Sequence, residues 1–230
     1  MSAIRLVIFD VAGTIIEDHG EVLTCFRRAL EKNGIKGTES ELSEWKGASK
    51  REVIRHFVER QFGAAGQSDR GEKAYADFRG LLEDHYRAHG VAPIAGAEAT
   101  FAWLREHNTL LATTTGFYRE VNDLILERVG WQKRFQASIS SSEVRQGRPA
   151  PFMIFRAMEA TGVTAVSQVI NVGDTPLDLQ AGSNAGVRGV VGVLTGMHSL
   201  ERLRREPHTH ILPSIAALPE LVEQQFARAG

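Results

Sequence analysis

A single carboxylate, Asp10, stands where a short apolar run gives way to a glycine turn. The run covers residues 4–9, and the turn reads Val-Ala-Gly-Thr at positions 11–14. In an open α/β sheet, ligands bind beyond the carboxyl ends of the strands. An acidic residue at the end of the first strand therefore lies where a substrate binds, and we expect Asp10 to be the centre of the chemistry.

Three threonines and a glycine, residues 113–116, close the next apolar run before a new helical segment. Hydroxyls and unpaired backbone N–H groups at a helix start form an anion site, which the helix dipole reinforces. This segment predicts a contact with a negatively charged substrate group.

A cation precedes another helix, because Arg148 is followed by Pro149 and Pro151. Proline is well tolerated in the first turn of a helix, so Arg148 is expected on the adjoining loop at the strand ends. A planar guanidinium can bind two phosphonate or phosphate oxygens at once.

Two further carboxylates, Asp174 and Asp178, follow an apolar run and flank Pro176, which begins a helix. Both can face one point near Asp10. Three carboxylates around a dianionic substrate repel it and each other unless a hard cation lies among them, and Mg²⁺ meets that need. We expect Asp10 and Asp174 to ligate directly, the Ala12 carbonyl to supply a third oxygen, and Asp178 to hold a metal-bound water or orient the loop.

The elements that position these residues alternate between strand and helix, which predicts a Rossmann-like parallel sheet with helices on both faces. A long helical region follows the first strand, and we interpret it as a small all-helical cap domain at 18–90, inserted into an α/β core of 1–17 and 91–230. The expected strands are 4–9, 109–113, 136–139, 168–172, 189–194 and 208–212; the expected helices are 22–32, 39–45, 49–62, 69–89, 97–107, 118–129, 151–161, 177–185 and 213–229.

The composition of the chain limits the classes of partner that it can bind. The 230 residues have a formal net charge of −1 with 24% charged residues, so the excess positive charge that nucleic acid requires is missing. The first apolar run is too short for a signal peptide, and no run approaches the ~20 residues of a membrane span, so we expect no membrane partner. Cys25 is the only cysteine, which excludes an intrachain disulfide and fits a cytoplasmic location.

Taken together, these residues and their order resemble the haloacid dehalogenase superfamily over essentially the whole chain. The third residue of the first motif is usually a second aspartate, and Ala12 at that position resembles the phosphonoacetaldehyde hydrolase branch, as does Arg148 where most members carry lysine. The resemblance implies that Asp10 attacks phosphorus and that Thr113 and Thr115 are the phosphoryl contacts, without ranking the two. It also implies a homodimer paired through cap helices. The remaining residues expected around the substrate are Ala12, Gly13, Gly47 and Gly116.

The alanine at position 12 cannot protonate a leaving group, so another residue must stabilise the negative charge that develops on that group. The segment 45–50 resembles the cap loop of the phosphonoacetaldehyde hydrolases, in which a lysine three residues after a glycine forms a Schiff base with the substrate aldehyde; here that lysine is Lys50, after Gly47. The iminium is an electron sink for the carbon–phosphorus bond. A nearby cation such as Lys46 or Arg51, or burial, would favour the neutral amine.

Four positions qualify this resemblance. The family has a methionine and a histidine where this chain has Lys46 and Val53, and a tyrosine where it has Phe117; His56, one turn later, is a candidate replacement for the missing histidine. The substrate is therefore expected to be a relative of phosphonoacetaldehyde with a different or bulkier carbonyl fragment, and not that compound itself.

Three alternatives stay open at this point. A phosphatase of the same fold would act on a small phosphate monoester, with Lys50 only binding substrate. A haloacid dehalogenase would need neither a metal nor the pair Asp174 and Asp178. A non-catalytic phosphate-binding protein would bind oxyanions without a covalent intermediate. His198, His208 and His210 are expected at the periphery.

Overall fold

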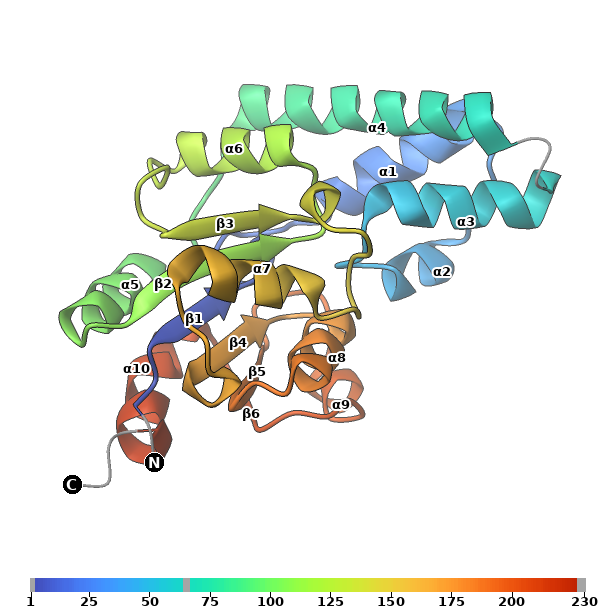
Figure 1. Ribbon diagram of the computed structural model, residues 1–230. Coiled ribbons are helices and arrows are strands. Elements are labelled where there is room, and N and C mark those ends of the chain that lie inside the picture. The colour runs from blue at the N-terminus through green and yellow to red at the C-terminus, as the bar shows by residue number, and fades with distance from the viewer. Residues whose placement is uncertain (1–2, 64–66, 227–230) are drawn as a thin grey trace.

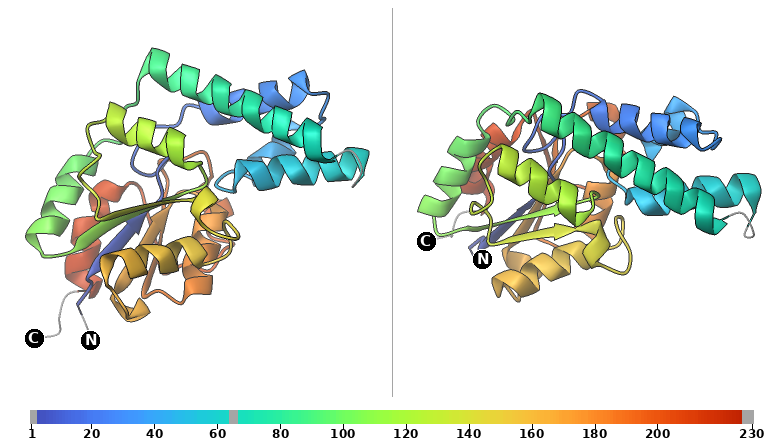
Figure 2. Two further views of the ribbon diagram at one scale, coloured as in Figure 1. Left: turned by 45° about the horizontal axis from the view of Figure 1, so that its top comes forward. Right: turned by 90° about the horizontal axis from the view of Figure 1, so that it is seen from above.

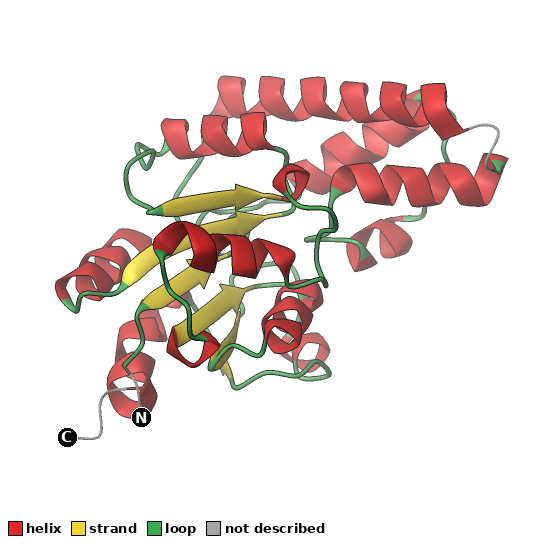
Figure 3. Ribbon diagram, in the orientation of Figure 1, coloured by secondary structure: helices red, strands yellow, loops and turns green. Residues whose placement is uncertain are grey.

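The computed structural model describes residues 3–63 and 67–226, which form a six-stranded parallel sheet and the helices around it. The strand order is β3-β2-β1-β4-β5-β6, with β1 at the centre. The predicted α/β class is confirmed (Figures 1 and 3).

The strands lie within a few residues of their predicted positions. Because β1 pairs with β2 on one side and β4 on the other, with Phe9 opposite both Thr113 and Val172, the ends of these three strands meet at one edge of the sheet. The strand bounds are β1 Leu6–Phe9, β2 Leu110–Thr115, β3 Ala137–Ser140, β4 Val169–Gly173, β5 Gly189–Val193 and β6 His210–Leu212.

Helices cover both faces of the sheet because successive side chains of a strand point to opposite faces. Val7 and Phe9 pack in one buried cluster with side chains of α5 and α6, whereas Leu6 and Ile8 pack in a second cluster with side chains of α7 and α8. The core helices are α5 Ala97–Glu106, α6 Arg119–Arg128, α7 Phe152–Thr161, α8 Pro176–Ala185, α9 Leu200–Leu203 and α10 Leu218–Leu221.

Four helices between β1 and α5 form the cap, beyond the arrowheads of the strands (Figures 1 and 2). Amphipathic helices α1 and α4 pack on each other, with Phe26 edge-to-face against Phe78, and α3 packs on α4. The cap helices are α1 Glu21–Lys32, α2 Glu39–Glu44, α3 Lys50–Phe62 and α4 Gln67–His89.

The two connections between cap and sheet run side by side. Ile16 and Pro93 form an antiparallel bridge, the Glu17 N–H donates to the Ala92 carbonyl at 2.9 Å, and the Ile94 N–H donates to the Ile15 carbonyl at 2.9 Å. These residues lie next to the predicted limits of the cap, 18 and 90, and the division into two domains stays a prediction.

The C-terminal segment differs from the predicted continuous helix over 213–229. It consists of a 3₁₀ turn at 215–217, then α10, then a π-type turn at 222–226, and residues 227–229 lie outside the described part of the chain. Pro219 lacks an N–H and suits only the first turn of a helix. It lies in the first turn of α10, which begins at Leu218. Across the described residues, no helix is both long and apolar enough to span a membrane.

Candidate active site

Asp10 follows β1 directly and is nearly buried, at 5% exposure. Its N–H donates to the Val172 carbonyl at 2.8 Å, which continues the sheet pairing by one residue and fixes the backbone from which the carboxylate projects. Gly13 then turns with φ of +86°, a left-handed conformation that glycine adopts without strain, and a Cβ there would lie 2.6 Å from Asp174 Oδ2. The glycine turn therefore brings the backbone against the second acidic residue.

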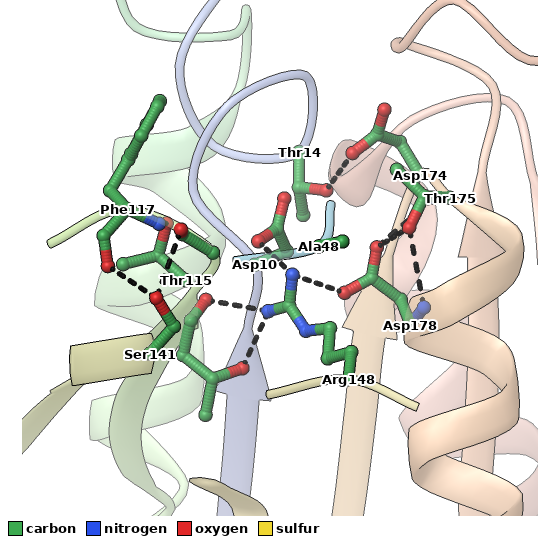
Figure 4. Close-up of polar contacts among 12 residues, drawn as sticks. Asp10, Thr14, Ala48, Thr115, Phe117, Ser141, Arg148, Asp174, Thr175 and Asp178 are labelled. Carbon is green, nitrogen blue, oxygen red and sulfur yellow. Dashed lines mark hydrogen bonds and ion pairs between the residues drawn. The ribbon is translucent and has the colours of Figure 1, made fainter. Parts of the chain in front are cut away.

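The three predicted carboxylates, Asp10, Asp174 and Asp178, come together with ligand oxygens within 4.8 Å of one another, all of them buried (Figure 4). Burial and mutual repulsion raise the pKa of Asp174, and burial raises the pKa of Asp178 against the opposing effect of Arg148. Thr14 Oγ1 donates to Asp174 Oδ1 at 3.1 Å, whereas Asp174 Oδ2 has no hydrogen-bond partner among the described residues. A buried carboxylate oxygen without a donor, beside two further carboxylates, fits a divalent cation.

Arg148 lies between two of these acids and has 5% exposure. Its Nη1 is 2.8 Å from Asp10 Oδ1 and 2.9 Å from Asp178 Oδ1, and its Nη2 donates to both the carbonyl and Oγ1 of Thr114 at 2.8 and 2.9 Å. These contacts direct the guanidinium to protein oxygens. In this arrangement Arg148 orients Asp10, and its two-point contact with a phosphonate stays a prediction.

Thr113 and Thr115 of β2 share one face of the sheet because side chains alternate along a strand, and they differ in their position along it. Thr113 donates to Ser138 Oγ of β3 at 2.7 Å, so its hydroxyl is used inside the sheet and the residue does not line the Asp10 cavity. Thr115 does line that cavity, and its Oγ1 accepts from the Phe117 N–H at 3.2 Å. Of the two residues left open by the sequence, only Thr115 is placed for a phosphoryl contact, whose existence stays a prediction.

The cap loop 45–49 closes directly on the sheet edge. A Cβ on Gly47, whose φ is +83°, would lie 2.7 Å from Thr175 Oγ1, and a Cβ on Gly116 would lie 2.5 Å from the Gly47 carbonyl oxygen. The Gly147 N–H donates to Glu52 Oε1 of α3 at 3.2 Å. Glycines at 47 and 116 thus allow the close approach of cap and core.

Lys50, the first residue of α3, is buried at 9% exposure, and its Nζ donates to the Ala48 carbonyl at 3.1 Å. Burial, followed by the charge of Lys46, lowers the pKa of Lys50 to about 8 against the opposing effect of Asp18 and Asp10. Lys46 in turn forms an ion pair with buried Asp18, with 2.7 Å between Nζ and Oδ2.

Two cavities meet at Lys50. The smaller, of about 30 Å³, reaches Asp10; it is lined by Asp10, Ala12, Asp18, Val22, Lys46, Gly47, Lys50, Thr115, Gly116, Phe117 and Thr175. The larger, of about 100 Å³ and here named the apolar cavity, is lined by Val22, Leu23, Phe26, Leu42, Trp45, Lys46, Lys50, Val53, Met197 and His198. The predicted nucleophile and the predicted Schiff-base lysine therefore share one cavity, although they lie 40 residues apart in the sequence.

Comparisons with known proteins agree with this geometry. A family model described as haloacid dehalogenase-like hydrolase matches residues 7–192. The chain belongs to the haloacid dehalogenase-like hydrolases. Among its relatives in this superfamily, a phosphonoacetaldehyde hydrolase from Bacillus cereus (strain ATCC 14579) is 29% identical over 99% of this chain and 89% of that protein. A bifunctional phosphonoacetaldehyde hydrolase/aminoethylphosphonate transaminase from Clostridioides difficile (strain 630) is 30% identical over 99% of this chain, which spans 37% of that longer protein.

Solved structures share the haloacid dehalogenase-like fold. A phosphonoacetaldehyde hydrolase-like protein from Oleispira antarctica superposes with a TM-score of 0.81 at 20% identity, covering 100% of this chain and 96% of that one. A hydrolase from Pseudomonas syringae superposes with a TM-score of 0.85 at 17% identity, covering 97% of this chain and 100% of that one. The predicted resemblance to phosphonoacetaldehyde hydrolases and the hydrolase class are thereby confirmed.

Sequence reasoning missed or misplaced several residues at this site. His56, considered as a replacement for the missing family histidine, is exposed and lines neither cavity; its ring packs at a tilt against Trp45 of the apolar cavity, with 5.0 Å between ring centroids. His198, expected at the periphery, lines the apolar cavity, and burial lowers its pKa to about 4. Thr114 was not distinguished as the partner of Arg148; only the strand register could have separated it from its neighbours.

Proposed function

We propose that this hydrolase cleaves the carbon–phosphorus bond of phosphonoacetaldehyde or a closely related carbonyl phosphonate, with Asp10 as nucleophile and Lys50 as Schiff-base lysine. The observation that carries the proposal is the shared cavity: a carboxylate and a buried amine face one small volume under the closed cap loop. Relatives named phosphonoacetaldehyde hydrolase over nearly the whole chain support it.

Lys50 acts first in this scheme. Its neutral amine adds to the carbonyl carbon, and loss of water gives an iminium ion. The lowered pKa of Lys50 makes the neutral amine available near neutral pH, since burial disfavours the charged form. A lysine at an exposed position would be almost fully protonated under the same conditions.

Asp10 then attacks phosphorus, and the carbon–phosphorus bonding electrons move into the iminium to give a neutral enamine. An aspartyl-phosphate remains on Asp10, and attack by water on that group releases phosphate. Protonation of the enamine carbon and hydrolysis of the resulting imine release the carbonyl product and restore Lys50. Arg148 holds Asp10 Oδ1 in position, which leaves Oδ2 for the attack.

The buried carboxylates of Asp10, Asp174 and Asp178 would hold Mg²⁺, with the Ala12 carbonyl as a further oxygen ligand. When bound, Mg²⁺ supplies positive charge that offsets the negative charge on the phosphoryl oxygens. Thr115 and the Gly116 N–H are the donors proposed for the same oxygens, whereas the Gly13 N–H already donates to the Ile16 carbonyl at 2.8 Å.

Reductive trapping tests the role of Lys50. Incubation with phosphonoacetaldehyde and borohydride is expected to reduce the iminium to a stable secondary amine, detected by peptide mass mapping on the peptide that carries Lys50. The Lys50→Arg variant should form no adduct and lose turnover, whereas the matched Lys36→Arg variant, at an exposed cap lysine, should behave like the wild type. Asp10→Asn should still form the adduct but release phosphate more slowly by roughly 10⁴-fold or more.

A phosphatase acting on a small phosphate monoester is the competing function. It predicts that Lys50→Arg retains turnover, that phosphate esters outpace carbonyl phosphonates, and that borohydride leaves no mass on Lys50. That combination would remove the Schiff-base proposal and leave Lys50 as a substrate-binding cation.

A further inference from the structure

We propose that the apolar cavity binds a short alkyl substituent on the carbonyl carbon of the substrate, so that the preferred substrate is a 2-oxoalkylphosphonate (a ketone) with about three carbon atoms beyond the carbonyl. This inference rests on the proposed function, whose substrate class it narrows.

The Asp10 cavity and the apolar cavity adjoin each other. Val22, Lys46 and Lys50 line both the Asp10 cavity and the apolar cavity. A carbonyl carbon bonded to Lys50 Nζ lies at this junction, with the phosphonate on the side of Asp10. A second substituent on that carbon therefore points toward the apolar cavity.

The second argument is the chemistry of the walls. The cavity is built from buried side chains of α1, α2 and α3, among them Phe26, Leu42 and Val53, each 3% exposed or less. Apolar walls favour an apolar occupant by about 25 cal/mol per Å² of surface removed from water.

The polar side chains that line the apolar cavity do not favour a charged ligand. The positive charge of Lys46 is paired with Asp18 at 2.7 Å. His198 Nε2 is buried without a hydrogen-bond partner among the described residues, and the lowered pKa of this side chain keeps the ring neutral at pH 7. A substituent bearing a carboxylate would gain no free cation here.

The third argument is size. The apolar cavity measures about 100 Å³, and a water-sized group occupies about 30 Å³ in a condensed phase, so about three heavy atoms fit. Met197 is 53% exposed where it lines the cavity, so the far end opens to the surface.

A ketone series measures the preference without comparing aldehydes with ketones, whose carbonyl reactivities differ. Phosphate release is followed with 2-oxopropyl-, 2-oxopentyl- and 2-oxooctylphosphonate, which carry methyl, n-propyl and n-hexyl groups. We expect kcat/KM to rise roughly tenfold from methyl to n-propyl, since each buried methylene strengthens binding about fourfold at most, and to rise little further at n-hexyl. A flat or falling series from methyl to n-propyl would overturn the inference.

A binding series separates this inference from the proposed reaction. Ethyl- and n-pentylphosphonate have no carbonyl group, and their binding in the presence of Mg²⁺ is measured by calorimetry. Tighter binding of n-pentylphosphonate supports the cavity assignment even if no carbon–phosphorus bond is cleaved. Equal binding of the two compounds contradicts the assignment even if phosphonoacetaldehyde is hydrolysed and trapped on Lys50.

Two cavity-filling variants locate the effect. Leu42→Trp places bulk inside the cavity, and Met197→Trp does so at its mouth, where the exposed position tolerates a larger side chain. Each variant is expected to abolish the gain of n-propyl over methyl, whereas the matched Phe155→Trp variant, at an exposed position on α7, should keep it. If both filled variants retain the full gain while folding normally, the alkyl group lies elsewhere.

Discussion

Asp10 and Asp178 share one cationic partner, the guanidinium of Arg148. A single guanidinium contacts two buried carboxylates and the Thr114 carbonyl, so its donors are held in one geometry. Because Arg148 is planar and presents several donors, a lysine at this position would contact fewer of these oxygens. We infer that Arg148 acts mainly by fixing the orientation of Asp10 and neutralising part of the acidic cluster.

The buried amine of Lys50 predicts an alkaline pH dependence of adduct formation. With a pKa of about 8, the neutral fraction rises about tenfold per pH unit up to pH 7 and levels off above pH 8, so the trapping rate should follow the same curve. The groups that act on this amine are Lys46 and Arg148, which lower its pKa, and Asp18 and Asp10, which raise it.

Removing Lys46 tests this electrostatic balance. Lys46→Met deletes a nearby positive charge and unpairs Asp18, and both effects raise the pKa of Lys50, so the inflection should move by about one pH unit to higher pH. Lys36→Met serves as the control. A wild-type inflection near pH 10, as for a solvated lysine, would contradict the buried environment.

At the scale of single residues, the sequence predicted which chemical groups are present better than where they point. Asp10, Asp174 and Asp178 could be found because each follows an apolar run, and strand ends meet at one edge of a parallel sheet. The orientation of Thr113, by contrast, depends on register: its hydroxyl faces Ser138 of a strand 25 residues away. No local pattern encodes that pairing.

At the scale of elements, the cap loop and the loop after β4 are matched surfaces. Gly47 lies against Thr175, whose Oγ1 donates to Asp178 Oδ2 at 2.5 Å and caps α8. The position of the cap loop is therefore coupled through Thr175 to an acidic residue of the proposed metal site.

Gly47→Ala tests that coupling. A Cβ there would clash with Thr175, and the left-handed backbone costs about 1–2 kcal/mol for any other residue. We expect kcat/KM to fall more than tenfold, together with a lower midpoint of urea unfolding.

Gly80→Ala is the matched control for that variant. Gly80 lies inside α4 with nothing within 4 Å of an added Cβ, and alanine there should stabilise the protein by about 0.5–1 kcal/mol with unchanged activity. Full activity in Gly47→Ala would show that the cap loop does not need this close contact.

Local sequence signals located most helices and strands but did not identify the type of every helix. Glycine and proline punctuation marked the helices and strands, because these residues end or begin elements for steric reasons. Short α9 had no strong periodicity, and the C-terminal segment passes through three helix types while packing Leu218 and Phe226 into the core. Tertiary packing decided those turns, as it decided that His198 reaches the apolar cavity from the loop after β5.

At the scale of the whole molecule, the buried acidic cluster couples stability to cation binding. Mg²⁺ should raise the free energy of unfolding in a saturable manner, by about 2.7 kcal/mol at a concentration one hundred times its Kd. Asp174→Asn should remove most of that gain and should stabilise the metal-free protein, since one of three mutually repelling carboxylates is deleted. An equal response of both proteins, at matched ionic strength, would mean that the ion binds elsewhere.

The paired connections at Ile16 and Pro93 have a consequence for evolution and engineering. The backbone leaves the sheet and returns to it at neighbouring positions, so we expect the segment between them to be exchangeable without disrupting the sheet, because its two ends already lie within hydrogen-bonding distance. Transplanting a different insertion at this junction would exchange Lys50 and most walls of the apolar cavity in one step, whereas Met197 and His198 would remain. The nucleophile and its acidic companions would stay with the recipient.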